Sequence, residues 1–510
     1  MAFEREIQEL DEQRKKALAM GGPKKLAALK AEGRLNARER LDVLLDEGSF
    51  VEEGLLARSI SDDPKVQERT PCDGKIAGFG TIDGRRVGVV SNDFTVMGAS
   101  SSKINGEKMA HIKNVCTKIG FPMVLLGESS GGRIPDNMGA YGMVFDSWGR
   151  KYIRDRKTPW ANALVGMSFG SAAWYACMSD FNVMTKKAIM SVASARLCSL
   201  ATGLNITPEE LGGYKLHEST GMADMVVDTD EEAMEAIKRF LSYLPSNNMQ
   251  PAPRVAVPEG SDEACQHMLE IVPEERTRVY DMKKVIKAIV DTDSFFELKP
   301  KWGRGMITAL ARIDGRSVGI VANNPIWKGG AMDADGCEKA TGFIVLCDSF
   351  NIPLIFMEDQ PGFLIGIEGE KRKMPGRIIN WMNAIGLATV PKITLQVRKA
   401  YGQGYLNMGG SQTSDEVCAW FTSETSFMGP EAAVGVVLGL KREDDPEKYD
   451  RTLAEIKKGI SCYEYARVFG CQDVIDPRES RTYLKRILDV YTPAGGIIGQ
   501  HKLSNWPTTY

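Results

Sequence analysis

Two nine-residue segments of the chain are nearly identical: Ile82–Val90 reads IDGRRVGVV, and Ile313–Val321, which lies 231 residues later, reads IDGRSVGIV. Seven of their nine positions carry the same residue. Further pairs follow at the same spacing or at one residue more: Pro122 with Pro353, Gly131 with Gly362, and Gly170 with Gly402. Matches in one order and at nearly constant spacing indicate that the chain contains two homologous halves.

Each half alternates predicted strands with predicted helices. The runs Pro122–Leu126 and Pro353–Met357 are continuously apolar and have the length of strands buried on both faces. The segment Thr229–Leu244 begins with a capping box and carries its apolar residues on one side, which predicts a helix. A corresponding helix is predicted to begin at Asp476 and Pro477. This alternation predicts an α/β fold.

A proline-rich polar segment, Pro245–Gly260, separates the two halves and has the composition of a linker. The length of 510 residues alone would suggest about three domains. Because the halves repeat each other, we expect two homologous domains instead, residues 1–250 and residues 263–510.

The composition is that of an ordinary soluble globular protein, with 43% apolar and 26% charged residues. The 64 basic and 67 acidic residues give a formal charge of −3, which does not favour a nucleic-acid or anionic-membrane partner. No segment approaches the roughly 20 apolar residues of a membrane span, and the charged N-terminus does not resemble a signal peptide. The ten cysteines form no CxxC pair, so we expect reduced thiols and a cytoplasmic location.

Glycine-bearing turns follow two predicted strands in each half. Glycine lets the backbone approach a ligand closely, and amide groups at a helix start carry partial positive charge. Two such amides aimed at one point form an oxyanion hole. Any one of these turns could simply be a tight connection, but the paired set favours a functional role. The four turns are Gly127–Pro135, Gly166–Ala173, Glu358–Ile365 and Ala400–Leu406.

Other motifs are weaker. Gly166–Gly170 fits the GxSxG nucleophile elbow of serine hydrolases, but the repeat places Ala400 where Ser168 stands, which disfavours Ser168 as a nucleophile. A near match to GxGxxG after Ala400 is poor evidence for a dinucleotide site, and no metal site is convincing. Arg133 and Asp136 could contact a ligand or form an ordinary surface ion pair.

The chain resembles a known family over nearly its whole length. That family comprises the carboxyltransferase (β) subunits of biotin-dependent acyl-CoA carboxylases, with propionyl-CoA carboxylase β subunits and related decarboxylase and transcarboxylase subunits most similar. The motifs that carry this resemblance occur in the family's order: Gly33–Leu41, Leu44–Phe50, Asp93–Gly98, Glu209–Gly213, Asp359–Phe363, Ala388–Lys392, Arg398–Gly402 and Met428–Glu431.

The resemblance implies two tandem crotonase-like domains of the ββα-superhelix type, assembled into a hexamer of stacked trimers. The N-terminal domain would bind acyl-CoA and the C-terminal domain of another subunit would receive carboxybiotin. Backbone N–H groups would stabilise the thioester enolate at Ser130, Gly131 and Gly132, and the biotin enolate at Gln403 and Gly404. The remaining site residues carried over by position are Gly170, Ser171, Tyr405 and Leu406 for the substrate, with Leu406 sensing the acyl chain, and Pro361, Gly362 and Phe363 on the biotin side.

The implied activity is transfer of CO2 between carboxybiotin and the α (or vinylogous) carbon of an acyl-CoA. We find no Met-Lys-Met-type biotinylation site and no ATP-grasp pattern, so the expected partners are a biotin carboxylase and a separate biotin carrier. We also expect no metal on this chain. Several turns depart from the family's usual residues, at Glu128–Arg133, Ser168–Ala172, Gly402–Tyr405 and Gly376–Trp381. Three alternatives therefore stay open: acyl-CoA decarboxylation linked to biotin, a biotin-independent crotonase-type reaction, and a catalytically decayed scaffold subunit.

Overall fold

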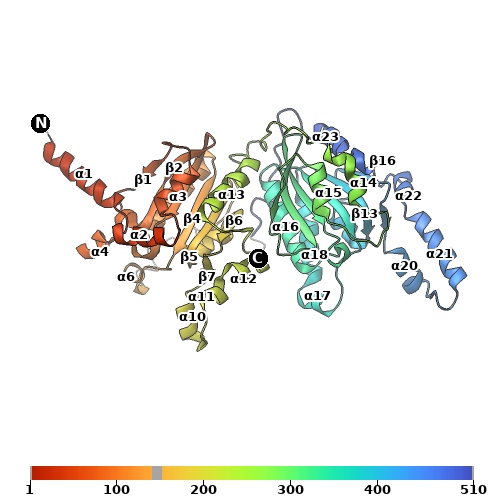
Figure 1. Cartoon of the computed structure of the whole chain (residues 1–510), viewed down its shortest axis with the longest axis horizontal. Coiled ribbons are helices and arrows are strands. Elements are labelled where there is room, and N and C mark those ends of the chain that lie inside the picture. The colour runs from red at the N-terminus through yellow and green to blue at the C-terminus, as the bar shows by residue number, and fades with distance from the viewer. Residues whose placement is uncertain (1–2, 141–151, 508–510) are drawn as a thin grey trace. The chain divides into compact units, whose positions relative to one another are not determined.

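The computed structural model describes residues 3–140 and 152–507. The chain forms two compact units, Met1–Ser242 and Tyr243–Tyr510, which we call the N-unit and the C-unit. Each unit is built around one mixed sheet of eight strands with helices packed against it (Figure 1).

The sheet of the N-unit has the order β1-β2-β3-β4-β5-β6-β8, and β7 pairs with the end of β5. The strands β1, β2 and β3 pair antiparallel, and all other neighbours pair parallel. The bounds are β1 Val51–Glu53, β2 Lys75–Ile82, β3 Arg85–Asn92, β4 Met123–Ser129, β5 Trp160–Phe169, β6 Phe181–Thr185, β7 Ile189–Ser191 and β8 Met225–Val227.

The sheet of the C-unit repeats this topology strand for strand, in the order β9-β10-β11-β12-β13-β14-β16, with β15 pairing with the end of β13. The antiparallel pairs are again the first two in the order. The bounds are β9 Phe296–Leu298, β10 Met306–Ile313, β11 Arg316–Asn323, β12 Leu354–Gln360, β13 Lys392–Tyr401, β14 Glu416–Trp420, β15 Glu424–Ser426 and β16 Asp473–Ile475.

The helices of the N-unit include the predicted helix Thr229–Leu244, which forms α13 (Asp230–Tyr243). Its capping box is present, because Thr229 N–H donates to Glu232 Oε2 and Glu232 N–H donates to Thr229 Oγ1. The other described helices are α1 Glu4–Leu18, α2 Pro23–Ala31, α3 Ala37–Leu44, α4 Pro64–Glu68, α5 Lys103–Ile119, α6 Ile134–Asn137, α9 Ser171–Met178, α10 Ala195–Thr202, α11 Pro208–Gly212, α12 Tyr214–Thr220, and the 3₁₀ turns η1 Pro71–Gly74 and η2 Met97–Ala99.

The predicted helix at Asp476 begins in the C-unit as a 3₁₀ turn, η6 (Pro477–Glu479), capped by Asp476, and continues as α23 (Ser480–Tyr491). The other helices of the C-unit are α14 Met268–Ile271, α15 Met282–Ile289, α16 Ala334–Ser349, α17 Ile367–Lys371, α18 Met374–Leu387, α19 Gly402–Asn407, α20 Pro430–Ala432, α21 Pro446–Gly459 and α22 Cys462–Arg467, with the shorter turns η3 Ala264–His267, η4 Lys328–Gly330 and η5 Ala433–Val437.

The repeated nine-residue segment is a β-hairpin turn followed by a buried strand. In each unit Asp-Gly forms the two-residue loop with both φ angles positive, 50° and 74° in β2–β3 and 54° and 74° in β10–β11. This is the backbone that two-residue hairpin loops favour. Asp46 accepts both loop amides in the N-unit, and Asp291 accepts both in the C-unit.

The glycine inside this segment has a packing role. A Cβ added to Gly88 would lie 2.2 Å from Cys116 Sγ on α5, and one added to Gly319 would lie 2.4 Å from Cys347 Sγ on α16. The long helix therefore lies directly on the sheet at the same place in both units. The predicted α/β fold with two tandem homologous domains is confirmed by the repeated topology.

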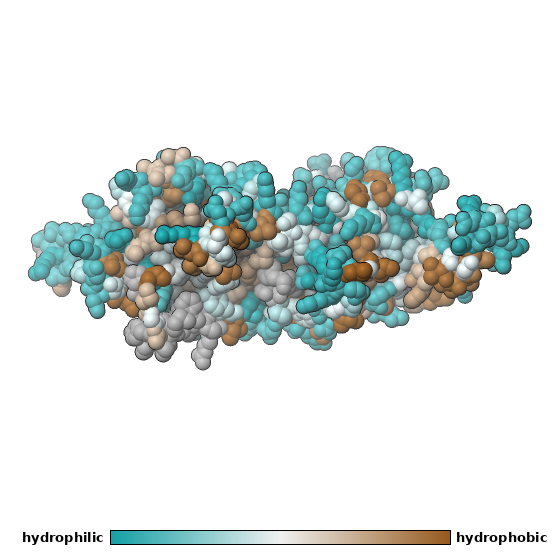
Figure 2. Space-filling view, turned by 90° about the horizontal axis from the view of Figure 1, so that it is seen from below, coloured by the Kyte–Doolittle hydropathy of each residue, from teal (hydrophilic) through white to brown (hydrophobic). Residues whose placement is uncertain are grey.

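Apolar side chains are exposed on α10 of the N-unit (Leu197, Leu200) and around η5 of the C-unit (Val436, Val437). Figure 2 shows apolar residues gathered at the end of the C-unit where α20 lies, among a largely hydrophilic surface. None of the helices that the structure describes is long and apolar enough to cross a membrane.

Candidate active sites

Three segments of the N-unit meet at the carboxyl ends of β4 and β5. Ser101 N–H donates to Gly131 O and Arg133 N–H donates to Ser101 O, each at 2.8 Å. A Cβ on Gly170 would lie 3.9 Å from Gly131 Cα, and the hydroxyls of Ser101 and Ser171 are 2.5 Å apart. The two glycine turns predicted for this half are therefore brought together.

The amide groups at this meeting point are not equally available. Ser130 N–H donates to Gly98 O at 2.8 Å, and Gly131 N–H donates to Ser129 Oγ at 3.1 Å. By contrast, the N–H groups of Gly132 and Ser171 have no acceptor within residues 3–140 and 152–507. Ser171 is the first residue of α9, where amide donors point out of the helix and carry partial positive charge. Gly132 and Ser171 thus each present a free N–H donor where the two glycine turns meet.

Ser168 cannot act as the nucleophile of a hydrolase, because its side chain is fully buried and its Oγ donates to Gly127 O at 3.1 Å. His217 is bound to a backbone carbonyl, Met190 O at 2.6 Å, and burial lowers its pKa. The sharp turn after Ser168 depends on Gly170, whose φ of 59° with ψ of −119° disfavours any residue with a side chain. The GxSxG match therefore reflects a turn that brings the start of α9 to the site.

A buried ion-pair network fixes the end of β4. Glu128 accepts from Arg34 at 2.7 Å and pairs with Arg40, which also pairs with Asp230 at the start of α13 at 3.0 Å. Burial alone would lower the pKa of Arg40, but Glu128 and Asp230 outweigh it and raise that pKa. The N-terminal arginines thus hold the strand end that precedes the turn.

Arg133 and Asp136 do form an ion pair, at 3.2 Å, but it is not on the surface as expected for an ordinary pair. Arg133 is 2% exposed and also pairs with the buried Asp73. The guanidinium donates further to Ser100 Oγ and Ser100 O, so it binds the segment before α5 to the turn after β4. This is a structural role that the sequence did not reveal.

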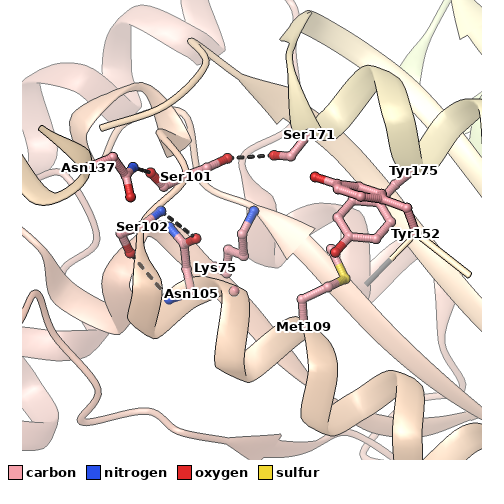
Figure 3. A pocket seen from close by; sticks show the side chains of 10 residues that line it. Lys75, Ser101, Ser102, Asn105, Met109, Asn137, Tyr152, Ser171 and Tyr175 are labelled. Atoms are coloured by element: carbon pink, nitrogen blue, oxygen red, sulfur yellow. Dashed lines mark hydrogen bonds between the residues drawn. The ribbon is translucent and has the colours of Figure 1, made fainter. Parts of the chain in front are cut away.

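A small cavity of about 30 Å³ adjoins the N-unit turns and is lined by Ser101, Asn105, Asn137 and Ser171 (Figure 3). Lys75, the first residue of β2, points into it, and its Nζ donates to Asn92 Oδ1 at 2.9 Å. Burial lowers the pKa of Lys75 to about 8. Sequence reasoning missed this residue, although a lysine at the start of an otherwise apolar strand, KIAGFGTI, was an available signal.

The C-unit repeats the backbone geometry of the N-unit site. Met332 N–H donates to Gly362 O at 3.1 Å, and Leu364 N–H donates to Met332 O at 2.8 Å. Gly402 has the same φ as Gly170 within a few degrees, 61° against 59°.

The helix α19 begins at Gly402, so the N–H groups of Gln403 and Gly404 lie in its first turn. Within the part of the chain that the structure describes, neither has an acceptor.

The side chains behind the C-unit site differ from those in the N-unit. Asp359 accepts from Arg398, Lys399 and Tyr280 at 2.7–3.0 Å. Glu358 is completely buried, and burial raises its pKa well above the usual value. Gln360 Nε2 donates to Glu358 Oε1 at 2.9 Å.

Gly404 packs closely against these side chains. A Cβ at this position would lie 2.5 Å from Gln360 Oε1 and 2.7 Å from Met332 Cε. A side chain at position 404, in the first turn of α19, would therefore force Gln360 or Met332 to move.

The other predicted C-unit residues surround this point. Tyr405 is half-buried and its hydroxyl lies 2.7 Å from those of Ser411 and Tyr465, while Leu406 is half-buried beside it. Pro361 is exposed, and the Phe363 ring contacts Trp381 edge-on at 6.3 Å between centroids. No group of side chains in the described residues could hold a metal ion.

Comparison with known proteins places the chain in a family. The model for the carboxyl transferase domain matches residues 29–494. The propionyl-CoA carboxylase carboxyltransferase subunit of Haloferax mediterranei is 34% identical, over 95% of each chain. The α subunit of methylmalonyl-CoA decarboxylase from Propionigenium modestum is also 34% identical, over 96% of each chain.

A solved structure gives the same result. The transcarboxylase 12S hexamer structure with methylmalonyl-CoA and methylmalonic acid bound has a TM-score of 0.90 and 33% identity, over 96% of each chain. The expected crotonase-like fold of both tandem domains is therefore confirmed, and so is the expected resemblance. The chain belongs to the carboxyl transferase domain family, and it is a carboxyltransferase of the kind found in biotin-dependent acyl-CoA carboxylases.

Proposed function

We propose that the N-unit holds the thioester of an acyl-CoA and that the C-unit receives biotin carried by a separate protein. One observation carries this assignment: each unit ends two neighbouring strands in glycine turns and presents free first-turn amides there, at Ser171 in the N-unit and at Gln403 and Gly404 in the C-unit. Two carbonyl oxygens, one of a thioester and one of a urea, each need such donors when negative charge develops on them.

In the N-unit, we assign the thioester oxygen to Gly132 and Ser171. The predicted set was Ser130, Gly131 and Gly132, but the amides of Ser130 and Gly131 are engaged by Gly98 O and Ser129 Oγ. Gly131 then acts through its backbone conformation, since its φ of 103° allows the turn that leaves Gly132 free. Each donor of this kind is worth about 3–4 kcal/mol of transition-state stabilisation.

In the C-unit, the N–H groups of Gln403 and Gly404 fit a urea oxygen, and we assign Pro361, Gly362 and Phe363 to the biotin side of this site. Biotin supplies the carboxyl group and a ring nitrogen that can accept the α-proton of the acyl group. The chain's own contribution is to hold both oxygens and to polarise them. Leu406 remains our candidate for contact with the acyl chain, and its apolar side chain suits an uncharged group at that point.

We further propose that the chain works as a hexamer with a biotin carboxylase and a biotin carrier as partners. The related 12S subunit forms a hexamer within a multienzyme core. Exposed apolar side chains on α10 and around η5 are of the kind that subunit contacts bury. The ten cysteines are all unpaired, which supports the expectation of a reducing cytoplasm.

Decarboxylation is the second candidate activity. It is favoured by the decarboxylase among the chain's relatives, whose identity to the chain equals that of the carboxylase. The same two sites would serve either direction, because a carboxyl transfer and its reverse share one transition state.

Incubation of the purified chain with a panel of acyl-CoAs and free biocytin tests the proposal. Carboxyl exchange that requires biocytin supports it, in whichever direction the exchange is faster. Turnover without biocytin would instead support a biotin-independent crotonase-type reaction. A folded protein that binds neither CoA esters nor biocytin would be a decayed scaffold.

A further inference from the structure

Among residues 3–140 and 152–507, three lysines are almost fully buried, Lys75, Lys108 and Lys339, with 5%, 9% and 3% exposure. A buried ammonium group is costly unless acceptors satisfy its three N–H donors. How each lysine meets this requirement therefore distinguishes a structural role from a binding role.

Two of the three are fully satisfied by backbone carbonyls. Lys108 Nζ donates to Gly54 O, Cys72 O and Lys75 O at 2.6–3.1 Å. Lys339, which occupies the equivalent position on α16, donates to three carbonyls at 2.8–3.1 Å: Lys299 O, Trp302 O and Met306 O. Both lysines tie the long helix to the start of a strand, so their charge is used inside the fold.

Lys75 is different. Its Nζ makes one hydrogen bond, to Asn92 Oδ1 at 2.9 Å, and no other acceptor within residues 3–140 and 152–507 meets it. Asn92 in turn donates from Nδ2 to Glu128 O at 2.6 Å, which fixes its Oδ1 toward the lysine. Two donors of a buried ammonium group are therefore left for something that is not part of the described chain.

These donors face the cavity beside the proposed thioester site. Figure 3 shows the Lys75 side chain extending into the space between Asn105 and Ser171. The volume of about 30 Å³ has room for a group of a few atoms rather than for a long chain. Hydroxyl and amide side chains, those of Ser101, Asn137 and Ser171 among them, line one side of the cavity, and Met109, Tyr152 and Tyr175 line the other side. The polar side suits the oxygen atoms of an anion.

The nearest charged groups do not neutralise Lys75. Asp73 is the acidic group that acts on it, but Asp73 already pairs with Arg133 and accepts from Ser102. Arg133 and Lys108 add positive charge nearby. The surroundings of Lys75 are therefore short of negative charge, and the chemistry that would correct this is an anion of carboxylate size.

We propose that Lys75 binds a carboxylate of the acyl-CoA in the N-unit, next to the thioester oxygen held at Gly132 and Ser171. The inference rests on the proposed function, since it places an acyl-CoA in this unit. The carboxylate has two possible sources: the carboxyl group that is transferred, on the carbon next to the thioester carbonyl, or a permanent acidic group farther along the acyl chain.

The experiment compares the wild type with Lys75→Met by titration calorimetry at pH 7. Methionine is the residue at the equivalent position of the C-unit, Met306, so the substitution has a precedent within the same fold. Two pairs of ligands are used: methylmalonyl-CoA with propionyl-CoA for the transferred carboxylate, and glutaryl-CoA with butyryl-CoA for a distal one. We expect the wild type to bind one carboxylated member at least about tenfold more tightly than its partner, as a charge-assisted hydrogen bond allows.

In Lys75→Met, that preference should fall about tenfold while the affinity for the uncarboxylated partner changes less than threefold. The pair that responds identifies the source of the carboxylate. Lys339→Met is the matched control, because it removes an equally buried ammonium from the other unit and should lower stability without altering either preference.

Equal affinity of the wild type for both members of both pairs would overturn the inference, whether or not the variant folds. So would a preference that survives in a folded Lys75→Met protein. Failure of the proposed function would be distinguishable, because the wild type would then bind none of the four esters and would show no exchange with biocytin.

Discussion

The two units repeat one backbone but differ in what lies behind the site. In the N-unit, Lys75 lines two small cavities at the start of α9, and Gly127 lines one of them. In the C-unit, the equivalent positions are Met306 and Glu358, and the space beneath α19 is taken by Gln360 and Met332. The comparison shows that the glycine turns and free helix amides are common to both sites, whereas the buried side chains are specific to each. We therefore expect backbone changes to affect the units alike and side-chain changes to affect them differently.

The largest difference between the units should come from the ion pairs behind the ends of β4 and β12, when one arginine of each is removed and the loss of unfolding free energy is compared. Arg40→Met removes the guanidinium shared by Glu128 and Asp230 and leaves buried carboxylates undercompensated, which should cost about 3–5 kcal/mol of unfolding free energy. Arg398→Met should cost less, because Asp359 keeps Lys399 and Tyr280. Urea unfolding followed by circular dichroism measures both. Equal losses, or a larger loss for Arg398→Met, would contradict this difference between the networks.

The close fit of Gly404 should make the C-unit site sensitive to a single methyl group. In Gly404→Ala, the added Cβ would collide with Gln360 Oε1 and Met332 Cε and would shift the first turn of α19. Carboxyl exchange with biocytin should fall about 100-fold, as for loss of one oxyanion donor, while the affinity for CoA esters stays within threefold. Gly386→Ala in α18 is the control, because a Cβ there meets nothing within 4 Å. A weakened affinity for CoA esters in Gly404→Ala would contradict the assignment of the acyl-CoA to the N-unit and of biotin to the C-unit.

The duplication and the positions of the turns could be predicted from the sequence because both depend on local signals. The Asp-Gly hairpin loop, the buried apolar strands and the capping box at Thr229 are all set by neighbouring residues, and each is present in the structure. The glycines that mark the turns were recognised for the same reason. Their catalytic roles are still predictions, since no ligand contact tests them.

The parts that the sequence did not reveal depend on contacts between distant segments. Nothing local shows that Ser130 N–H is engaged by Gly98 O, which lies on another turn, or that Arg133 is buried against Asp73. Lys75 is the clearest case. Its proposed binding role follows from its having fewer hydrogen-bond acceptors than Lys108 and Lys339. The acceptors around each ammonium group come from segments that are distant in sequence, so only the folded structure brings them together.

The titration of Lys75 should have a smaller effect, which is a pH dependence of the unfolding free energy that comes from the N-unit alone. Its pKa is lowered from 10.5 to about 8 by burial, with Asp73 raising it and Arg133 and Lys108 lowering it further. Between those pH values the unfolded chain holds a proton that the folded protein has released, so the free energy of unfolding gains a contribution that rises with pH.

Lys75→Met lacks this contribution, and Lys108 titrates in both proteins, so its effect largely cancels in their difference. The unfolding free energy of the wild type minus that of the variant should therefore increase from pH 8 to pH 10.5, by about 3 kcal/mol at most. Urea unfolding at four pH values across that window measures it. A difference that stays flat would mean that Lys75 is not desolvated as the structure has it.

In the C-unit, Glu358 should give the unfolding free energy a pH dependence of the opposite sign. The substitution that tests it, glutamate to glutamine, is the smallest of those proposed. Because burial raises its pKa, the folded protein keeps a proton there that the unfolded chain loses above pH 4.5, so this group makes the protein less stable as pH rises from that value. Glu358→Gln removes the titration and can keep a hydrogen bond with Gln360, so its effect at pH 4 should be within about 1 kcal/mol. Relative to the wild type, the variant should then gain stability toward pH 7. Urea unfolding at pH 4 and pH 7 tests this, with Glu416→Gln as a control at a carboxylate that accepts from Tyr483. If Glu358→Gln instead lost stability relative to the wild type from pH 4 to pH 7, the buried carboxyl group would have to be ionised. The C-unit site would then carry a negative charge, opposite in sign to Lys75 in the N-unit.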